Sequence, residues 1–204
     1  MKKNNVSCFW DFYKWQIMAA LVVAVLGIYL LWHALTQKEC ALSVMLLDCH
    51  SDVSEEQMEE ELLQALQLDK TKYTVSVQSS LMLTDTGSGS YAMTSLSRLL
   101  ADIGSEKLDV CGMLEKDFLE YEEAGTFMDL RACMGEGELG IFGDALLETE
   151  DGRVIGIYAD ALPGMQKSGC YDTAAGRGVI GIVYNTKHAE KAGEYLMYLV
   201  GAGL

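Results

Sequence analysis

The chain has 204 residues, half of them hydrophobic, and its 30 acidic and 15 basic side chains give a formal net charge of −15. This length suits one globular domain plus an appendage. Binding to phosphate backbones requires clustered Lys and Arg, and the sequence has no extended basic run, so nucleic acid is excluded as a partner. Most of the acidic side chains are expected on a solvated surface.

The first predicted element is an uncharged apolar segment, residues 15–37. Its 23 residues, at about 1.5 Å per helical residue, would span about 34 Å, more than a hydrocarbon core of about 30 Å. Aromatic residues stand near both ends, as at membrane interfaces: Trp10, Trp15, Tyr29 and Trp32. A core helix is the competing interpretation, but a chain this short cannot bury such a helix on all sides. We therefore predict one transmembrane helix at residues 15–37.

The charges on either side of this segment predict its orientation. Residues 1–14 carry three Lys against one Asp, whereas residues 38–204 have 12 basic and 29 acidic side chains. The positive-inside rule makes residues 1–14 a cytoplasmic tail and residues 38–204 an extracytoplasmic domain. No small-x-small cleavage site follows the apolar run, and small residues do not precede Cys40 as in a lipoprotein. A single-pass anchor in the cell membrane is therefore favoured over a signal peptide or a lipid anchor.

The six cysteines place one thiol, Cys8, in the tail and five in the outer domain. Because five is odd, at least one outer cysteine is unpaired within the chain, and the pairing of the others is open. The run "DCHSD" at residues 48–52 offers metal ligands, but no second ligand pair follows at a useful spacing. We expect neither a metal nor another cofactor. Cys49 and Cys111 are better explained as buried small hydrophobic side chains.

From Ala41 onward, short apolar runs alternate with amphipathic helical patterns. Strands are predicted at residues 41–49, 72–78, 107–114, 152–160 and 178–186. Helices are predicted after a cap at Ser54, at 91–103, at 115–125, around 139–147 and at 188–203, and residues 160–177 are predicted to form a loop. Strand–helix alternation repeated three times predicts a parallel sheet covered by helices on both faces. The expected fold is α/β, a three-layer α/β/α lobe with a mostly parallel sheet of about five strands.

Two stretches carry a family resemblance. The run "SRLLADIGSEKLDVCGMLEKDFLEYEEAGTFMDL" (residues 97–130) resembles the first lobe of bacterial type 2 extracellular solute-binding proteins. That family has an (S/G)-x-x-x-D-V strand and a hydrophobic L-x-D-L exit, matched here by residues 104–110 and 125–130. The chain's end is similar to the family's returning strand followed by N-(S/T)-x-(H/N)-x-E-x-A. The matching residues are Asn185, Thr186, His188, Glu190 and Ala192.

The resemblance covers most of residues 41–204, and these motifs are structural rather than catalytic. It implies a periplasmic-type binding protein, which usually has two lobes, runs to about twice this length and clamps its ligand between the lobes. Here only residues 135–164 lie where the second lobe would be inserted, too few to bury a core of their own. The resemblance therefore implies a single shortened lobe, with the apolar helix in place of the family's lipidated cysteine.

In an open parallel sheet, ligands lie beyond the carboxyl ends of the strands. The loops after the first three predicted strands therefore supply the candidate contacts for a ligand or partner. These are His50, Ser51, Asp52, Thr84, Asp85, Ser88, Ser90, Tyr91, Leu114 and Glu115. Residues 84–90 lack the GK[ST] of a phosphate loop and the three-glycine dinucleotide fingerprint, and Asp85 would repel an anion. A mobile turn in which Ser88 or Ser90 caps the next helix is the simpler interpretation, and a ligand contact is the alternative.

No catalytic residue is predicted, because GxSxG and the context of a nucleophile elbow are absent. The acids of residues 115–123 are most simply a solvated face. The favoured function is a membrane-anchored, solute-binding-like module that binds or senses a small molecule or peptide at the cell surface. The alternative is a non-catalytic scaffold domain of the cell envelope that has lost ligand binding and contacts an envelope protein or a second copy of itself. The polar edge loops favour the first function, and the missing lobe favours the second.

Overall fold

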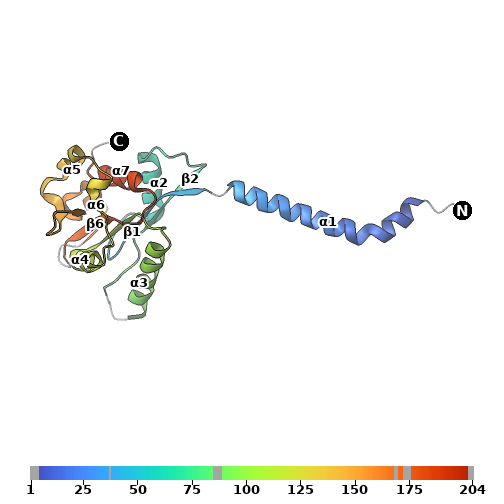
Figure 1. The fold of residues 1–204 in the computed structure, drawn as a ribbon, viewed down its shortest axis with the longest axis horizontal. Helices are drawn as coiled ribbons and strands as arrows, with labels where there is room; N and C mark the ends of the chain where they lie inside the picture. Colours follow the sequence, from blue (N-terminus) through green and yellow to red (C-terminus); the bar gives the residue numbers. More distant parts are fainter. Residues whose placement is uncertain (1–4, 37, 85–88, 168–169, 172–175, 202–204) are drawn as a thin grey trace. The chain divides into compact units, whose positions relative to one another are not determined.

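The computed structural model of the protein describes residues 5–36, 38–84, 89–167, 170–171 and 176–201. The chain divides into two compact units, Met1–Lys38 and Glu39–Leu204. The first unit holds the helix α1 (Asn5–Thr36), and almost all of its described side chains are exposed. The elements of the second unit can be followed in Figure 1.

The predicted transmembrane helix at residues 15–37 is contradicted. Among the residues that the structure describes, no helix combines the length and the apolar character needed to cross a membrane. The segment is helical, as part of α1, but the structure does not support the predicted single-pass anchor.

Within the described residues, the second unit is built on a six-strand mixed sheet. Its strands are β1 (Glu39–Leu46), β2 (Tyr73–Gln78), β3 (Val110–Leu114), β4 (Leu146–Glu148), β5 (Val154–Tyr158) and β6 (Gly178–Ile182). They lie in the order β2-β1-β3-β6-β5-β4. β1 pairs in parallel with β2 and β3, whereas the pairs β3–β6, β6–β5 and β5–β4 are antiparallel.

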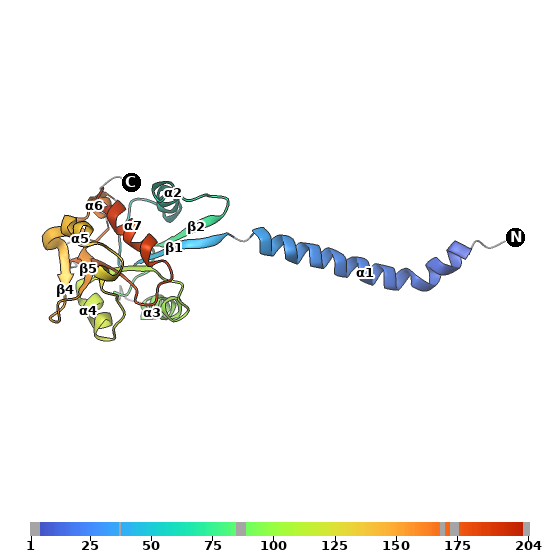
Figure 2. The same cartoon turned by 45° about the horizontal axis from the view of Figure 1, so that its top comes forward.

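Helices cover both faces of this sheet. They are α2 (Glu55–Ala65), α3 (Gly89–Gly104), α4 (Glu115–Glu123), α5 (Glu136–Phe142), α6 (Pro163–Lys167) and α7 (Ala189–Leu199), with short 3-10 turns at Leu130–Ala132, Gly143–Ala145 and Ala159–Ala161. Figures 1 and 2 show α2, α5, α6 and α7 on one face and α3 and α4 on the other. Alternation along β1 explains the two cores, since Leu42, Val44 and Leu46 pack into one and Met45 and Leu47 into the other.

The cap predicted at Ser54 is confirmed. The backbone N–H of Gln57 donates to the Ser54 hydroxyl at 3.3 Å, and the Ser54 N–H donates to the Gln57 side chain at 3.4 Å. This reciprocal capping box satisfies donors that the first helical turn leaves free. It starts α2 so that Leu62 and Leu66 face the sheet, where both are buried.

The expectation of a mostly parallel sheet of about five strands is wrong, although the domain is α/β. The connections through α2 and α3 are crossovers, which keep β1, β2 and β3 parallel. After α4 the chain makes a hairpin of β4 and β5 around residues 149–152, where the Gly152 N–H donates to Thr149 O at 2.9 Å. A two-strand hairpin is antiparallel by construction. The helix predicted around 139–147 ends at Phe142, and the predicted loop 160–177 contains α6.

A buried carboxylate, Asp109, joins three parts of the domain. Its Oδ2 accepts the backbone N–H of Ser43 at 2.8 Å, and its Oδ1 accepts the Thr186 hydroxyl at 2.5 Å. His188 Nδ1 lies 3.1 Å from the same Oδ1. Asp109, the aspartate of the D-V motif, therefore contacts Thr186 and His188 of the second motif. These contacts tie β3 to β1 and to the segment that leads into α7.

We expect Asp109→Ala to lower the free energy of unfolding by about 3 kcal/mol, because the change removes charge-assisted hydrogen bonds and leaves the Ser43 N–H buried without an acceptor. Urea unfolding followed by circular dichroism measures this loss. His188→Ala removes only a partly exposed partner and should cost about 1 kcal/mol or less. Equal losses in the two variants would contradict the central role of the carboxylate.

Candidate functional site

The loops that follow β2 and β3 meet the segment that precedes β6 at a cleft of about 450 Å³. We call it the carboxyl-edge cleft. Its lining residues are Leu83, Thr84, Leu114, Glu115, Lys116, Asp117, Gly176 and Arg177. Because β6 is antiparallel to β3, its first residue, Gly178, pairs with Leu114, the last residue of β3. This pairing places Gly176 and Arg177 at the carboxyl ends of the parallel strands, the edge of the sheet where the sequence predicts contacts for a ligand or partner.

Three of the predicted contacts, Thr84, Leu114 and Glu115, come together in this cleft. The predicted residues of the loop after β1, His50, Ser51 and Asp52, are not among its lining. The Ser51 hydroxyl instead bonds with the backbone of Val53 at 3.1 Å. Tyr91 also lies outside the lining, and its hydroxyl donates to Ser80 O at 3.1 Å. Asp85, Ser88 and the side chain of Ser90 lie outside the described residues.

Asp48, which was not among the predicted site residues, holds one wall of the carboxyl-edge cleft. Its Oδ1 accepts the backbone N–H groups of Leu83 and Thr84 at 3.1 and 3.0 Å. In the described part of the chain, its Oδ2 is buried without a hydrogen-bond partner. The residue has a φ of 54°, a left-handed conformation that Asp tolerates better than most residues. Its position just after a buried apolar strand is the sequence feature that could have identified it as a site residue.

The cationic wall of the cleft is Arg177. Its guanidinium donates to both carboxylate oxygens of Asp160 at 2.9 Å, and it lies 3.5 Å above the ring of Tyr158. The Tyr158 hydroxyl donates to Glu115 Oε1 at 2.7 Å. The hydrogen bond from Arg177 lowers the pKa of Asp160, whereas burial and then the bond to Glu115 raise the pKa of Tyr158. This chain of contacts holds Arg177 and Glu115 in fixed positions at the cleft.

Two more charged residues of the cleft are Lys116 and Asp117. Burial, followed by the negative charge of Asp48, raises the pKa of Asp117. Among the described residues, neither Asp117 nor the exposed Lys116 forms a salt bridge. The cleft therefore offers an ammonium group and a partly desolvated carboxylate to a ligand.

A disulfide joins Cys49, just after β1, to Cys170, after α6. The interpretation of Cys49 as a simple buried hydrophobic side chain is therefore wrong, and its sulfur is not free to serve as a metal ligand. Of the other outer cysteines, Cys111 is buried, Cys133 is half-buried and Cys40 is exposed. Burial raises the pKa of the Cys111 thiol, so this group stays protonated. In the described ranges, no three acidic, His or Cys side chains are grouped to hold a metal ion.

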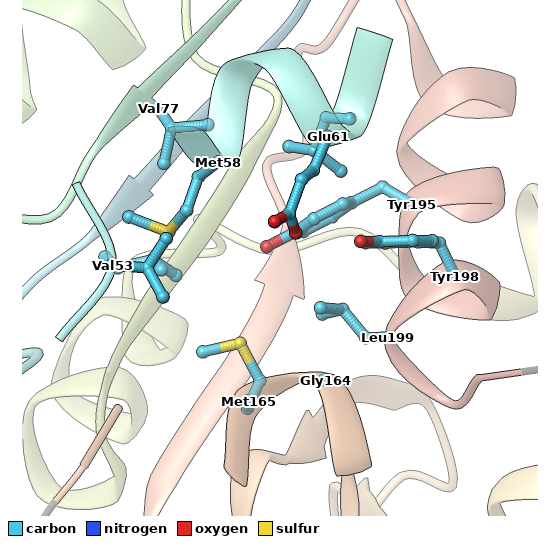
Figure 3. A pocket seen from close by; sticks show the side chains of 11 residues that line it. Val53, Met58, Glu61, Val77, Gly164, Met165, Tyr195, Tyr198 and Leu199 are labelled. Carbon is cyan, nitrogen blue, oxygen red and sulfur yellow. The ribbon is translucent and has the colours of Figure 1, made fainter. Parts of the chain in front are cut away.

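A second, smaller hollow lies between α2, α6 and α7 and is shown in Figure 3. We call it the apolar pocket; its volume is about 130 Å³. It is lined by Leu46, Val53, Met58, Glu61, Leu62, Val77, Gly164, Met165, Tyr195, Tyr198 and Leu199. None of its lining residues was predicted from the sequence as a site residue. Two sequence features indicate such a hollow. Glu61 lies next to apolar side chains of α2, and two tyrosines lie three residues apart on the last helix, so that they share one face.

Comparisons of the chain with models of protein families, with curated proteins and with solved structures find no match. The resemblance to type 2 extracellular solute-binding proteins therefore rests on the motif residues alone.

The disulfide joins cysteines 121 positions apart in the sequence, so we expect the double variant Cys49→Ser, Cys170→Ser to lose about 2–5 kcal/mol of stability. Thermal melts of the variant, and of the parent chain with and without dithiothreitol, measure the effect. Cys40→Ser, at an exposed free thiol, is the control and should leave the melting temperature unchanged. A reduced parent chain that melts like the oxidised one would refute a stabilising disulfide.

Proposed function

We propose that the chain is a non-catalytic binding module whose carboxyl-edge cleft binds a small polar solute or peptide. The observation that carries this proposal is the gathering of opposite charges from separate segments around one cleft of about 450 Å³. Asp117 and Lys116 come from the start of α4, and Arg177 comes from the segment before β6. A volume between about 300 and 1,000 Å³ is usual for small-molecule sites.

The charge arrangement favours a ligand that carries both signs, such as a short peptide with free ends. An ammonium group of the ligand would pair with Asp117, whose carboxylate is already partly desolvated. A carboxylate of the ligand would pair with the Lys116 ammonium group, and Arg177, held by Asp160, forms a fixed wall beside it. Groups held in place before binding lose little entropy when the ligand arrives.

The proposed location is an oxidising, extracytoplasmic compartment. Disulfides persist in such compartments and are rare where glutathione and thioredoxin keep thiols reduced. The bond between Cys49 and Cys170 supports this location. The resemblance of residues 97–130 and 178–199 to a solute-binding lobe supports it as well.

A domain that binds another envelope protein, or a second copy, is the alternative. Tyr91, Met93 and Leu100 on α3 are each more than half exposed. A hollow of about 200 Å³ beside them includes Met93 and shares Leu83 and Asp117 with the carboxyl-edge cleft. Exposed apolar side chains next to a cleft are typical of an interaction surface.

The proposal predicts that the tripeptide Ala-Ala-Ala binds the chain, whereas its acetylated and amidated form binds at least tenfold more weakly, because the blocked form lacks both charges. Isothermal titration calorimetry measures both affinities. Asp117→Asn should weaken binding of the free tripeptide about tenfold, since a hydrogen bond to a charged group contributes about 1.5–3 kcal/mol.

Glu123→Gln, an exposed change on the same helix, is the matched control and should bind like the parent chain. Equal binding of the free and blocked peptides would contradict the charge pairing. Absence of binding by peptides, amino acids and sugars would favour the interaction domain.

A further inference from the structure

The apolar pocket has the size of one small hydrophobic group. Leu46 of β1 and Val77 of β2 contribute from the sheet, Leu62 from α2, Met165 from α6 and Leu199 from α7. Its volume of about 130 Å³ is close to that of an engineered apolar cavity of about 150 Å³ that binds benzene. A single ring or a branched alkyl chain would therefore fill it.

One end of the pocket is polar. Figure 3 shows the Glu61 carboxylate and the hydroxyls of Tyr195 and Tyr198 turned toward one another. Across the described residues, none of these three groups forms a hydrogen bond to the protein, and Glu61 has no salt bridge. The pocket therefore combines an apolar cavity with a carboxylate for which the described residues supply no cationic partner.

The charge at this end is that of Glu61. Burial, and then the negative charge of Glu61, raises the pKa of Tyr198, and burial raises the pKa of Tyr195. Both phenols are therefore neutral at physiological pH, and their oxygens can accept a hydrogen bond from an ammonium group. Their ring faces also attract cations, and the formal net charge of −15 adds a negative potential that favours positive ligands.

The walls of the pocket are held in place by the fold. A Cβ added at Gly164 would lie 3.0 Å from the Leu199 carbonyl oxygen, so a larger residue there would press α6 and α7 apart. The Cys170 N–H donates to Met165 O at 3.2 Å, and Cys170 is linked to Cys49 through the disulfide. The pocket therefore exists before a ligand enters.

From these observations we infer that the apolar pocket is a second ligand site, which binds a small apolar amine in its ammonium form. The hydrocarbon part occupies the cavity, and the ammonium group pairs with Glu61 and donates to Tyr195 or Tyr198. An anion of the same shape is repelled by Glu61, and a neutral analogue lacks the ion pair. The site is independent of the carboxyl-edge cleft, with which it shares no lining residue.

Benzylammonium, benzyl alcohol and benzoate are the probes, because they share one ring and differ in the charge of the polar group. Calorimetric titration of the 204-residue chain with each should show benzylammonium binding at least tenfold more tightly than benzyl alcohol, and no binding of benzoate. A thermal-shift assay should show a rise in melting temperature with benzylammonium. Equal affinity for the amine and the alcohol would overturn the inference.

Glu61→Gln should reduce the affinity for benzylammonium about tenfold and leave that for benzyl alcohol unchanged. Glu60→Gln, one residue away on α2 and paired with Lys70 on the surface, is the matched control and should bind like the parent chain. Tyr198→Phe provides a second variant, with a smaller loss of affinity for the amine. Unchanged amine binding in folded Glu61→Gln would overturn the inference. Unchanged amine binding in Asp117→Asn separates this site from the carboxyl-edge cleft.

Discussion

The antiparallel pairing of β6 with β3 is the constraint on which the rest of the domain depends. Leu114 pairs with Gly178 at one end of the ladder, and Val110 pairs with Ile182 at the other. The first end brings Arg177 beside Glu115, whose N–H donates to Arg177 O at 2.8 Å. The second end delivers the chain to Asp109, which anchors the start of α7. If β6 ran parallel to β3, neither the carboxyl-edge cleft nor the Asp109 contacts would form.

Two glycines of β6, Gly178 and Gly181, leave room for aromatic rings that pack against this strand. A Cβ at Gly178 would lie 2.4 Å from the ring of Tyr171, and a Cβ at Gly181 would lie 2.6 Å from the ring of Phe118. The aromatic rings therefore lie against the strand where its side chains are missing. Phe118 stacks on Phe127 with ring centroids 3.8 Å apart. Local packing of this kind explains why β6 is glycine-rich and still fully buried.

The first half of the domain was predictable because its signals are local. Apolar runs, helical stripes and the Ser54 cap predict β1, α2, β2, α3 and β3, and crossover connections make these strands parallel. The placement of Thr84, Leu114 and Glu115 at one edge followed from that order. The direction of the strands in the second half was not predictable, because an apolar run does not show whether a strand will pair in parallel or antiparallel with its neighbour. β4 has only three residues, and the contributions of Arg177 and of the Cys170 disulfide depend on tertiary contacts that a sequence pattern does not encode.

The disulfide adjoins both hollows. On one side, Cys49 follows Asp48, whose carboxylate holds the Leu83–Thr84 backbone at the carboxyl-edge cleft. On the other side, Cys170 donates a hydrogen bond to Met165, a wall of the apolar pocket. One covalent bond therefore restrains a neighbour of each site, although the two sites share no lining residue. The disulfide therefore lies beside both hollows without lining either of them.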